Sequence, residues 1–132
     1  MPRTNLPRPT DAELEILRVL WEQGPCTVRD VHTTLEQQRE IGYTTVLKFM
    51  QIMAAKGLVE RDETARAHVY KARVAQEQTQ RQLIGHLLER AFGGSATKLM
   101  MQALSSSHAS AEEIAQMRQM LTEFEKGKDR QP

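Results

Sequence analysis

The sequence predicts a mainly α-helical protein, in which three helices and a small β-hairpin are followed by a second helical region. Apolar residues recur at the three- and four-residue spacing of a helix over most of the 132 residues. Between the two helical parts lie two short runs of β-branched and aromatic residues, which are typical of strands. We therefore expect one domain at residues 1–74 and a second at residues 75–132.

The composition is that of a soluble globular protein. Hydrophobic residues make up 39% and charged residues 27%, and a formal net charge of +1 indicates neither an acidic nor a basic partner. No apolar run is long enough to span a membrane, and residues 1–9 read as an extended arm rather than a signal peptide. Cys26 is the only cysteine, which suits a packing role in a reducing cytoplasm. We expect a cytoplasmic protein with no cofactor and no metal site.

Two short helices open the first domain. Thr10 and Glu13 form a capping box for the first, which runs to about Glu22 and ends at Gly24 and Pro25. Its inward stripe is Leu14, Leu17 and Trp21, flanked by Ile16 and Leu20. Thr27 opens the second helix, residues 28–35, whose inward residues are Val28, Val31 and Leu35.

The third helix carries the strongest functional signal. Val46, Met50 and Met53 recur on one side, and Gly57 follows the last periodic residue, where a left-handed residue ends a helix. The opposite side holds Thr44, Thr45, Lys48 and Gln51. Short hydroxyls at a helix N-terminus, with Lys and Gln further along, can touch phosphates and base edges. Taken alone, the same pattern also fits the solvated face of an ordinary helix.

A β-hairpin follows this helix. Its strands are expected at residues 58–62 and 67–72, with the loop at residues 63–66. An isolated hairpin is marginally stable, so this one must lean on the helices. Three helices followed by a hairpin are the order of a winged helix-turn-helix, in which the hairpin is the wing. Seven Lys or Arg and four Asp or Glu lie between residues 39 and 74, which makes a modest basic patch.

The second region has broad apolar stripes and few residues to cover them. Gly93 and Gly94 break its first helix, Ser95 caps a second, residues 105–107 form a loop, and Ser110 opens a last helix that Gly127 ends. Such stripes either fold back on the first domain or pack against a second copy, and a reader of palindromic DNA favours the second copy. The predicted dimer interface is Leu83, Leu87, Leu88, Phe92, Leu99, Met117, Leu121 and Phe124.

Five stretches of the sequence, in this order and spacing, resemble the penicillinase-repressor family of the BlaI and MecI type. They are residues 10–21, 27–31, 43–46, 56–59 and 66–70. The resemblance implies a dimeric repressor, in which a winged-helix domain binds a palindromic operator and C-terminal helices form the dimer. The expected DNA-binding residues are Tyr43, Thr44, Thr45, Lys48, Gln51, Arg66 and His68.

The chain departs from the family pattern at three places. Ile52 stands where members commonly carry Arg, so one polar contact of the third helix is missing. Repressors of the β-lactam circuit are inactivated by a membrane sensor protease that cuts an Asn-Phe bond, and the matching residues here are Gln102 and Ala103. The paired C-terminal cysteines of the related copper-responsive repressors are absent, so we do not expect copper sensing.

Two other classes of function compete with a repressor. A winged helix can serve as a protein-interaction module that never touches DNA, although such modules tend to lose the basic residues that this wing retains. An enzyme needs a nucleophile with a base, or a metal cluster. The four histidines are scattered without ligand spacing, and Cys26 has no evident partner. We therefore expect a DNA-binding protein and not an enzyme.

Overall fold

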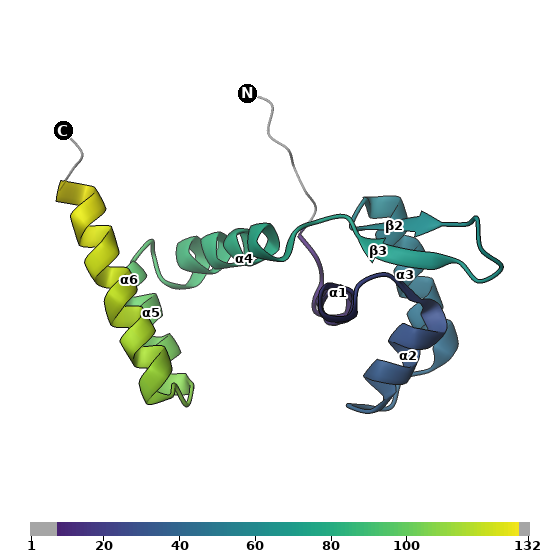
Figure 1. Cartoon of the computed structure of the whole chain (residues 1–132), viewed down its shortest axis with the longest axis horizontal. Helices are drawn as coiled ribbons and strands as arrows, with labels where there is room; N and C mark the ends of the chain where they lie inside the picture. The colour runs from purple at the N-terminus through teal and green to yellow at the C-terminus, as the bar shows by residue number, and fades with distance from the viewer. Residues whose placement is uncertain (1–7, 130–132) are drawn as a thin grey trace, which may run out of the picture. The chain divides into compact units, whose positions relative to one another are not determined.

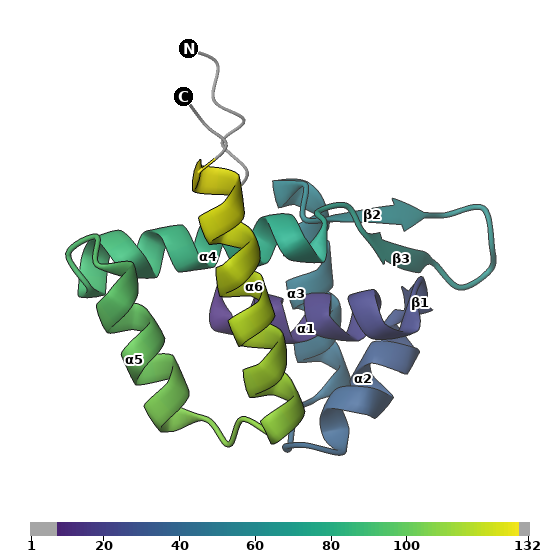
Figure 2. The same cartoon turned by 60° about the vertical axis from the view of Figure 1, so that its left-hand side comes forward.

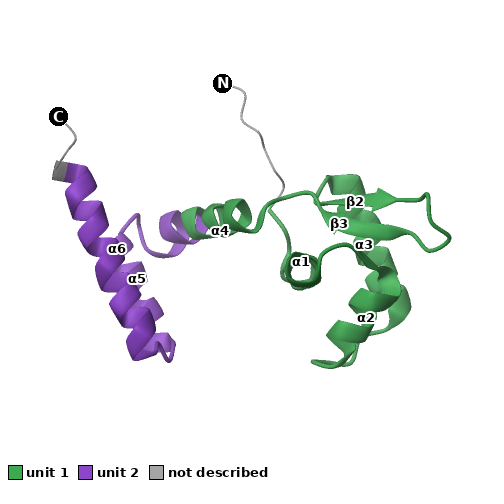
Figure 3. Cartoon of the chain, in the orientation of Figure 1, with its two compact units in different colours: residues 1–85 green, residues 86–132 purple. Residues whose placement is uncertain are grey.

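The computed structural model describes residues 8–129. The chain divides into two compact units, Met1–Gly85 and His86–Pro132, which are coloured separately in Figure 3. The elements in chain order are α1 (Asp11–Gln23), β1 (Cys26–Thr27), α2 (Val28–Glu36), α3 (Tyr43–Lys56), β2 (Val59–Asp62), β3 (Val69–Ala72), α4 (Gln76–Ala91), α5 (Ala96–Ser106) and α6 (Ala111–Asp129), as labelled in Figure 1. Residues 1–7 of the predicted arm and 130–132 of the tail lie outside the described residues.

The first unit is built on a core shared by α1, α2, α3 and the sheet. The predicted inward residues of α2 and α3 are buried, with Val31, Val46, Met50 and Met53 all at 0% exposure. In the predicted stripe of α1, Leu17 is buried and Trp21 is half-buried against the core, whereas Leu14 is half-buried outside it. Ile16, Val19 and Leu20 are buried as well. The reason is that α1 packs against α2, α3 and β3 at once, so its buried face is wider than one stripe.

The sheet has three strands, where the sequence predicted a hairpin of two. The additional strand β1 pairs with β3 in antiparallel register, Cys26 opposite Tyr70 and Thr27 opposite Val69, and gives the order β1-β3-β2. The residues of β2 and β3 pair from Val59 with Ala72 to Asp62 with Val69, so the loop spans residues 63–68 and is longer than predicted. A strand of two residues is too short to show a period of its own. Figures 1 and 2 show the β2–β3 loop projecting away from the three helices.

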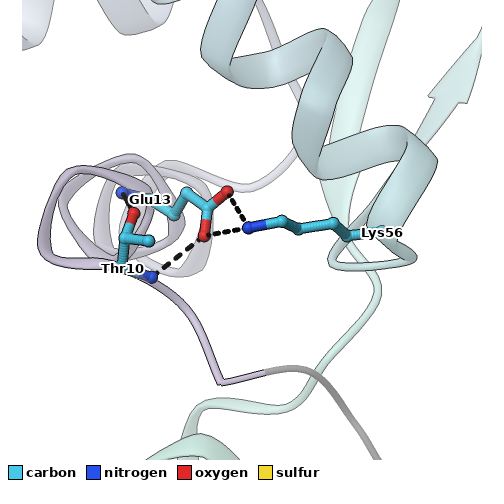
Figure 4. Close-up of polar contacts among 3 residues, drawn as sticks. All are labelled: Thr10, Glu13 and Lys56. Carbon is cyan, nitrogen blue, oxygen red and sulfur yellow. Dashed lines mark hydrogen bonds and ion pairs between the residues drawn. The ribbon is translucent and has the colours of Figure 1, made fainter.

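An ion pair ties the start of α1 to the end of α3 (Figure 4). Thr10 and Glu13 form the predicted capping box, and the Lys56 ammonium donates to both Glu13 carboxylate oxygens at 3.1 and 2.9 Å. Glu13 is 2% exposed. Burial alone would raise the pKa of its carboxyl, but the hydrogen bonds from Lys56 and from the Thr10 amide outweigh burial and lower it. Gly57 ends α3 with φ of 85°, the left-handed conformation that glycine adopts most readily.

The second unit differs from its prediction at two helix ends. Ser105 and Ser106 belong to α5 rather than to a loop. The Ser105 hydroxyl donates to the Met101 carbonyl at 2.8 Å, a bond that a serine side chain can make within a helix. Gly127 lies within α6, which continues to Asp129. The predicted break at Gly93 and Gly94 is present, with both at positive φ. None of the described residues of this unit is buried.

Candidate nucleic-acid interface

The polar side of α3 is an exposed surface on a rigid element. Thr44, Thr45, Lys48 and Gln51 are all exposed, opposite the fully buried Val46, Met50 and Met53. Within the described part of the chain, the side chains of Lys48 and Gln51 make no hydrogen bond or ion pair. The core therefore fixes the helix and leaves this surface available to another molecule.

The N-terminus of α3 differs from those of its neighbours. Thr10, Thr27 and Ser95 accept hydrogen bonds from the first turns of α1, α2 and α5, whereas Gly42 gives α3 no side-chain cap. The first-turn amides of α3 thus have no side-chain acceptor, and they lie beside the hydroxyls of Thr44 and Thr45. Amides at a helix N-terminus favour anions, phosphate among them.

His32 holds the turn that leads into α3. Its Nε2 lies 2.9 Å from the Ile41 carbonyl oxygen, so this nitrogen carries the proton that is donated. Its ring meets the Tyr43 ring edge-on, with centroids 5.8 Å apart and an interplanar angle of 82°. This histidine therefore has a structural role in the described part of the chain. Tyr43 itself remains 43% exposed at the start of the helix.

The basic patch between residues 39 and 74 is smaller than its number of cations suggests. Four of its cations lie within 3.8 Å of a carboxylate, in the pairs Arg39–Glu15, Lys56–Glu13, Arg61–Glu63 and Lys71–Glu60. Lys48, Arg66 and Arg73 make no ion pair with the described residues. His68 Nε2 lies 4.0 Å from a Glu63 oxygen and pairs with it only when protonated. The unpaired cations of the patch that a ligand could contact are therefore Lys48, Arg66 and Arg73.

Asp62 shapes the loop of the wing. Its carboxylate accepts hydrogen bonds from the Thr64 amide at 2.9 Å and the Thr64 hydroxyl at 2.7 Å. These bonds lower the pKa of Asp62, so the side chain stays ionised while it fixes the turn. Beyond that turn, Arg66 and His68 are both exposed.

A groove lies between α2, α3 and the wing. It has a volume of about 540 Å³ and is lined by Thr27, Val28, Arg29, Tyr43, Leu47, Arg66, Ala67, His68 and Tyr70. It brings together three of the predicted DNA-binding residues, Tyr43, Arg66 and His68. Arg29 also lines the groove, although it is not among the predicted DNA-binding residues. Its position in the first turn of the helix before α3 was the only signal that could have indicated it.

The predicted dimer residues of the second region are accessible in the single chain. Leu87, Leu121 and Phe124 are 43%, 50% and 73% exposed. The other five are half-buried: Leu83, Leu88, Phe92, Leu99 and Met117. A groove of about 490 Å³ between α5 and α6 is lined largely by apolar side chains, among them Met100, Leu104, Ile114, Met117 and Leu121.

Neither a metal centre nor a membrane span is found among residues 8–129. No three His, Cys, Asp or Glu side chains lie together there as metal ligands would. None of the helices is both long and apolar enough to cross a membrane. Cys26 is buried, and desolvation, with the nearby Asp30 carboxylate, raises the pKa of its thiol, as expected for a packing residue.

Three helices with an exposed polar face on the third, together with a wing, define the class of winged-helix DNA-binding proteins. The chain matches the model of the penicillinase repressor family over residues 9–123. It is 31% identical over 129 residues to the transcriptional regulator BlaI of Mycobacterium tuberculosis, which covers 96% of this chain and 92% of that protein. It is 23% identical over 123 residues to the penicillinase repressor of Bacillus licheniformis, with coverages of 93% and 96%.

The chain belongs to the penicillinase repressor family, and the resemblance seen in its sequence is confirmed. It is accordingly a transcriptional repressor and not an enzyme. The solution structure of the DNA-binding domain of the repressor BlaI matches it with a TM-score of 0.49 and 22% identity, covering 58% of this chain and 90% of that one. The individual DNA-binding and dimer residues stay predictions, as does the division at residue 74.

Proposed function

We propose that this protein is a homodimeric repressor of the β-lactam-resistance regulator type, which binds a palindromic operator. In this proposal α3 enters the major groove and the wing lies against the neighbouring backbone. The observation that carries it is the two-sided character of α3: three buried side chains anchor the helix, and the exposed side presents Lys48 and Gln51 unpaired. Side chains that read base edges need this combination of rigid support and free polar groups.

The residues divide into base readers and backbone contacts. Lys48 and Gln51 reach base edges, because Lys pairs with guanine acceptors and Gln with adenine. Tyr43, Thr44 and Thr45 hold phosphate at the uncapped N-terminus of α3. Arg66 and His68 contact the backbone or the adjacent minor groove from the wing.

The second region forms the dimer. Its helices expose Leu87, Leu121 and Phe124, and they border an apolar groove between α5 and α6. A second copy is the occupant that matches this surface, because a two-fold dimer uses the same apolar patch twice and doubles the DNA contacts on a palindrome. The methionines of the groove can adjust their shape to such a partner.

The test of the proposal is binding of the whole protein to DNA selected from a random pool. We expect the selected sequences to be palindromic, two protomers to bind each duplex, and affinity to fall steeply as salt rises. A random duplex of equal length is the control and should bind more weakly. Failure to bind any duplex would instead favour the alternative, a winged-helix module for protein interaction.

Inactivation by a membrane sensor protease is the regulatory part of this proposal. The bond between Gln102 and Ala103 lies in α5, where both residues are exposed and no residue is buried. A helix with so few buried contacts opens locally at low cost, which a protease requires. Cutting there separates α6 from the rest of the chain. Mass spectrometry of the repressor from β-lactam-treated cells tests this, and intact protein beside derepressed target genes would contradict it.

A further inference from the structure

The groove beside α3 is lined by basic side chains and by no acidic one. Arg29 enters it from the first turn of α2, and Arg66 and His68 enter it from the wing. Neither arginine makes an ion pair with the described residues, and no Asp or Glu lines the groove. The carboxylate of Asp30, the next residue to Arg29, accepts from the Thr27 amide at 3.0 Å and makes no ion pair with Arg29.

Unpaired guanidinium groups on two walls of one groove offer hydrogen-bond donors to an anion from both sides. Arginine offers a planar set of donors that matches a phosphate, and such charge-assisted bonds are stronger than neutral ones. The groove also has apolar and aromatic lining from Tyr43, Leu47 and Tyr70, which suits the sugar that joins one phosphate to the next. A volume of about 540 Å³ accommodates a short piece of one strand rather than a duplex.

The position of the groove identifies that strand. Tyr43 and Leu47 belong to the first two turns of α3, so the groove begins where the proposed reading helix begins. A helix in the major groove is flanked by two backbones, and the helix before it crosses one of them. A strand lying in this groove would be flanked by the first turn of α2 on one side and by the wing on the other.

We propose that this groove holds the sugar-phosphate backbone of one operator strand, and that Arg29 is a phosphate contact as important as Arg66. Arg29 grips the strand from α2 and Arg66 grips it from the wing, so the two arginines fix the register in which α3 meets the bases. This inference rests on the proposed function, which it deepens by adding a DNA-contacting residue outside α3 and the wing.

The first experiment compares Arg29→Ala with Arg18→Ala in the full-length protein. Arg18 is also exposed and unpaired among the described residues, but it lies on α1 and does not line the groove. We expect Arg29→Ala to weaken binding about tenfold, equally on the pool-selected duplex and on a random one. The slope of log affinity against log salt should fall by about one unit for each bound protomer. Arg18→Ala should change neither quantity.

The second experiment locates the contact. Single phosphates of the selected duplex are replaced in turn by uncharged methylphosphonates, and each duplex is titrated with wild type, Arg29→Ala and Arg66→Ala. Wild type should lose affinity at particular phosphates, and each variant should be insensitive at one of them. The proposal requires these two sites to be the same phosphate or neighbours on one strand.

Three outcomes separate the possible failures. If Arg29→Ala behaves like Arg18→Ala while wild type binds the selected duplex, the groove inference is wrong and the proposed function stands. If the Arg29 and Arg66 sites map to opposite strands, the shared groove is wrong. If wild type binds no duplex, the proposed function itself fails. Equal thermal unfolding temperatures of the variants and wild type establish that all are folded.

Discussion

The two units of this chain contrast in how much apolar surface each hides by itself. The first unit buries residues from three helices and a sheet, among them Leu17, Val46 and Tyr70 at 1% exposure or less. The second has amphipathic helices of similar length, yet none of its described residues is buried. Periodicity alone does not reveal this difference, because both units carry apolar residues at helical spacing. What differs is the number of elements that meet around a common centre.

The contrast corresponds to the division of labour in the proposed function, in which the first unit reads DNA and the second forms the dimer. A DNA-reading surface has to be rigid, and the first unit obtains rigidity from its own core and from the Glu13–Lys56 pair at 2.9 Å. A dimer surface has to remain free until the partner binds, and the second unit leaves its leucines and Phe124 accessible. The first unit is therefore expected to be stable at any concentration, and the second to gain its stability on association.

The largest expected effect comes from placing charge on the surface of the second unit. Leu121→Glu would bury an unpaired carboxylate in the proposed dimer and cost about 3–5 kcal/mol of association free energy. Sedimentation should show a monomer where wild type is a dimer at micromolar concentration. The matched change Gln119→Glu, on the same helix and also exposed, should leave the dimer intact. If wild type is itself a monomer under these conditions, the accessible apolar surface of the second unit is not the proposed dimer surface.

A core truncation in the first unit should come next. Leu17→Ala creates a cavity at a residue with 0% exposure, which typically costs about 2–5 kcal/mol of unfolding free energy. Phe124→Ala, at 73% exposure, should barely change the stability of the dissociated chain. Urea unfolding at low protein concentration measures both. Comparable losses in the two variants would mean that the second unit has a core of its own.

The link between α1 and α3 gives a pH-dependent effect. The folded-state pKa of Glu13 is lowered, so its contribution to stability is present above the unfolded-state pKa and is lost as pH falls through the folded value. Lys56→Met should cost about 1–3 kcal/mol near neutral pH, because it leaves Glu13 buried without its cation. The deficit relative to wild type should shrink on acidification below about pH 4.3. Urea unfolding from pH 7 down to pH 3 tests this, and a deficit independent of pH would contradict it.

The smallest expected effects distinguish residues of the first unit that read bases from residues that contact the DNA backbone. Lys48→Ala should cost about 1–3 kcal/mol more on the operator than on random DNA if it reads a guanine. Arg66→Ala should weaken binding to both and lower the salt slope by about one unit per protomer. Titrations against both duplexes at several salt concentrations measure the affinity losses and the salt slopes. Equal losses for Lys48→Ala on the two sequences would make Lys48 a phosphate contact.

Ile52 gives a further test of the proposed role of α3 in reading bases. It is 39% exposed and lies one turn after Lys48, on the same side of the helix. Ile52→Arg introduces the residue that family members commonly carry there. We expect tighter binding to all duplexes and a changed base preference at one operator position, measured by repeating the selection with the variant. An unchanged selected sequence would place this residue outside the reading surface.

The sequence by itself determined the helices of the first unit, the polar face of α3 and the presence of a wing. These features depend on local rules: side-chain period, capping residues such as Thr10 and Ser95, and Gly57 at a left-handed helix end. The family also followed from the sequence, because its motifs are spread along the chain in fixed order. Apart from the family motifs, each of these signals is local to one helix or one strand.

Only the tertiary structure decided which of the remaining polar groups are free. Lys56 is the last residue of α3, yet it pairs with Glu13, 43 residues earlier. Four of the seven cations counted as a basic patch are likewise paired, while Arg29 joins Arg66 and His68 in one groove. Strand β1 exists because β3 passes beside it. Such contacts join residues far apart in the chain, and a charge or a two-residue segment carries no local mark of the partner it will meet.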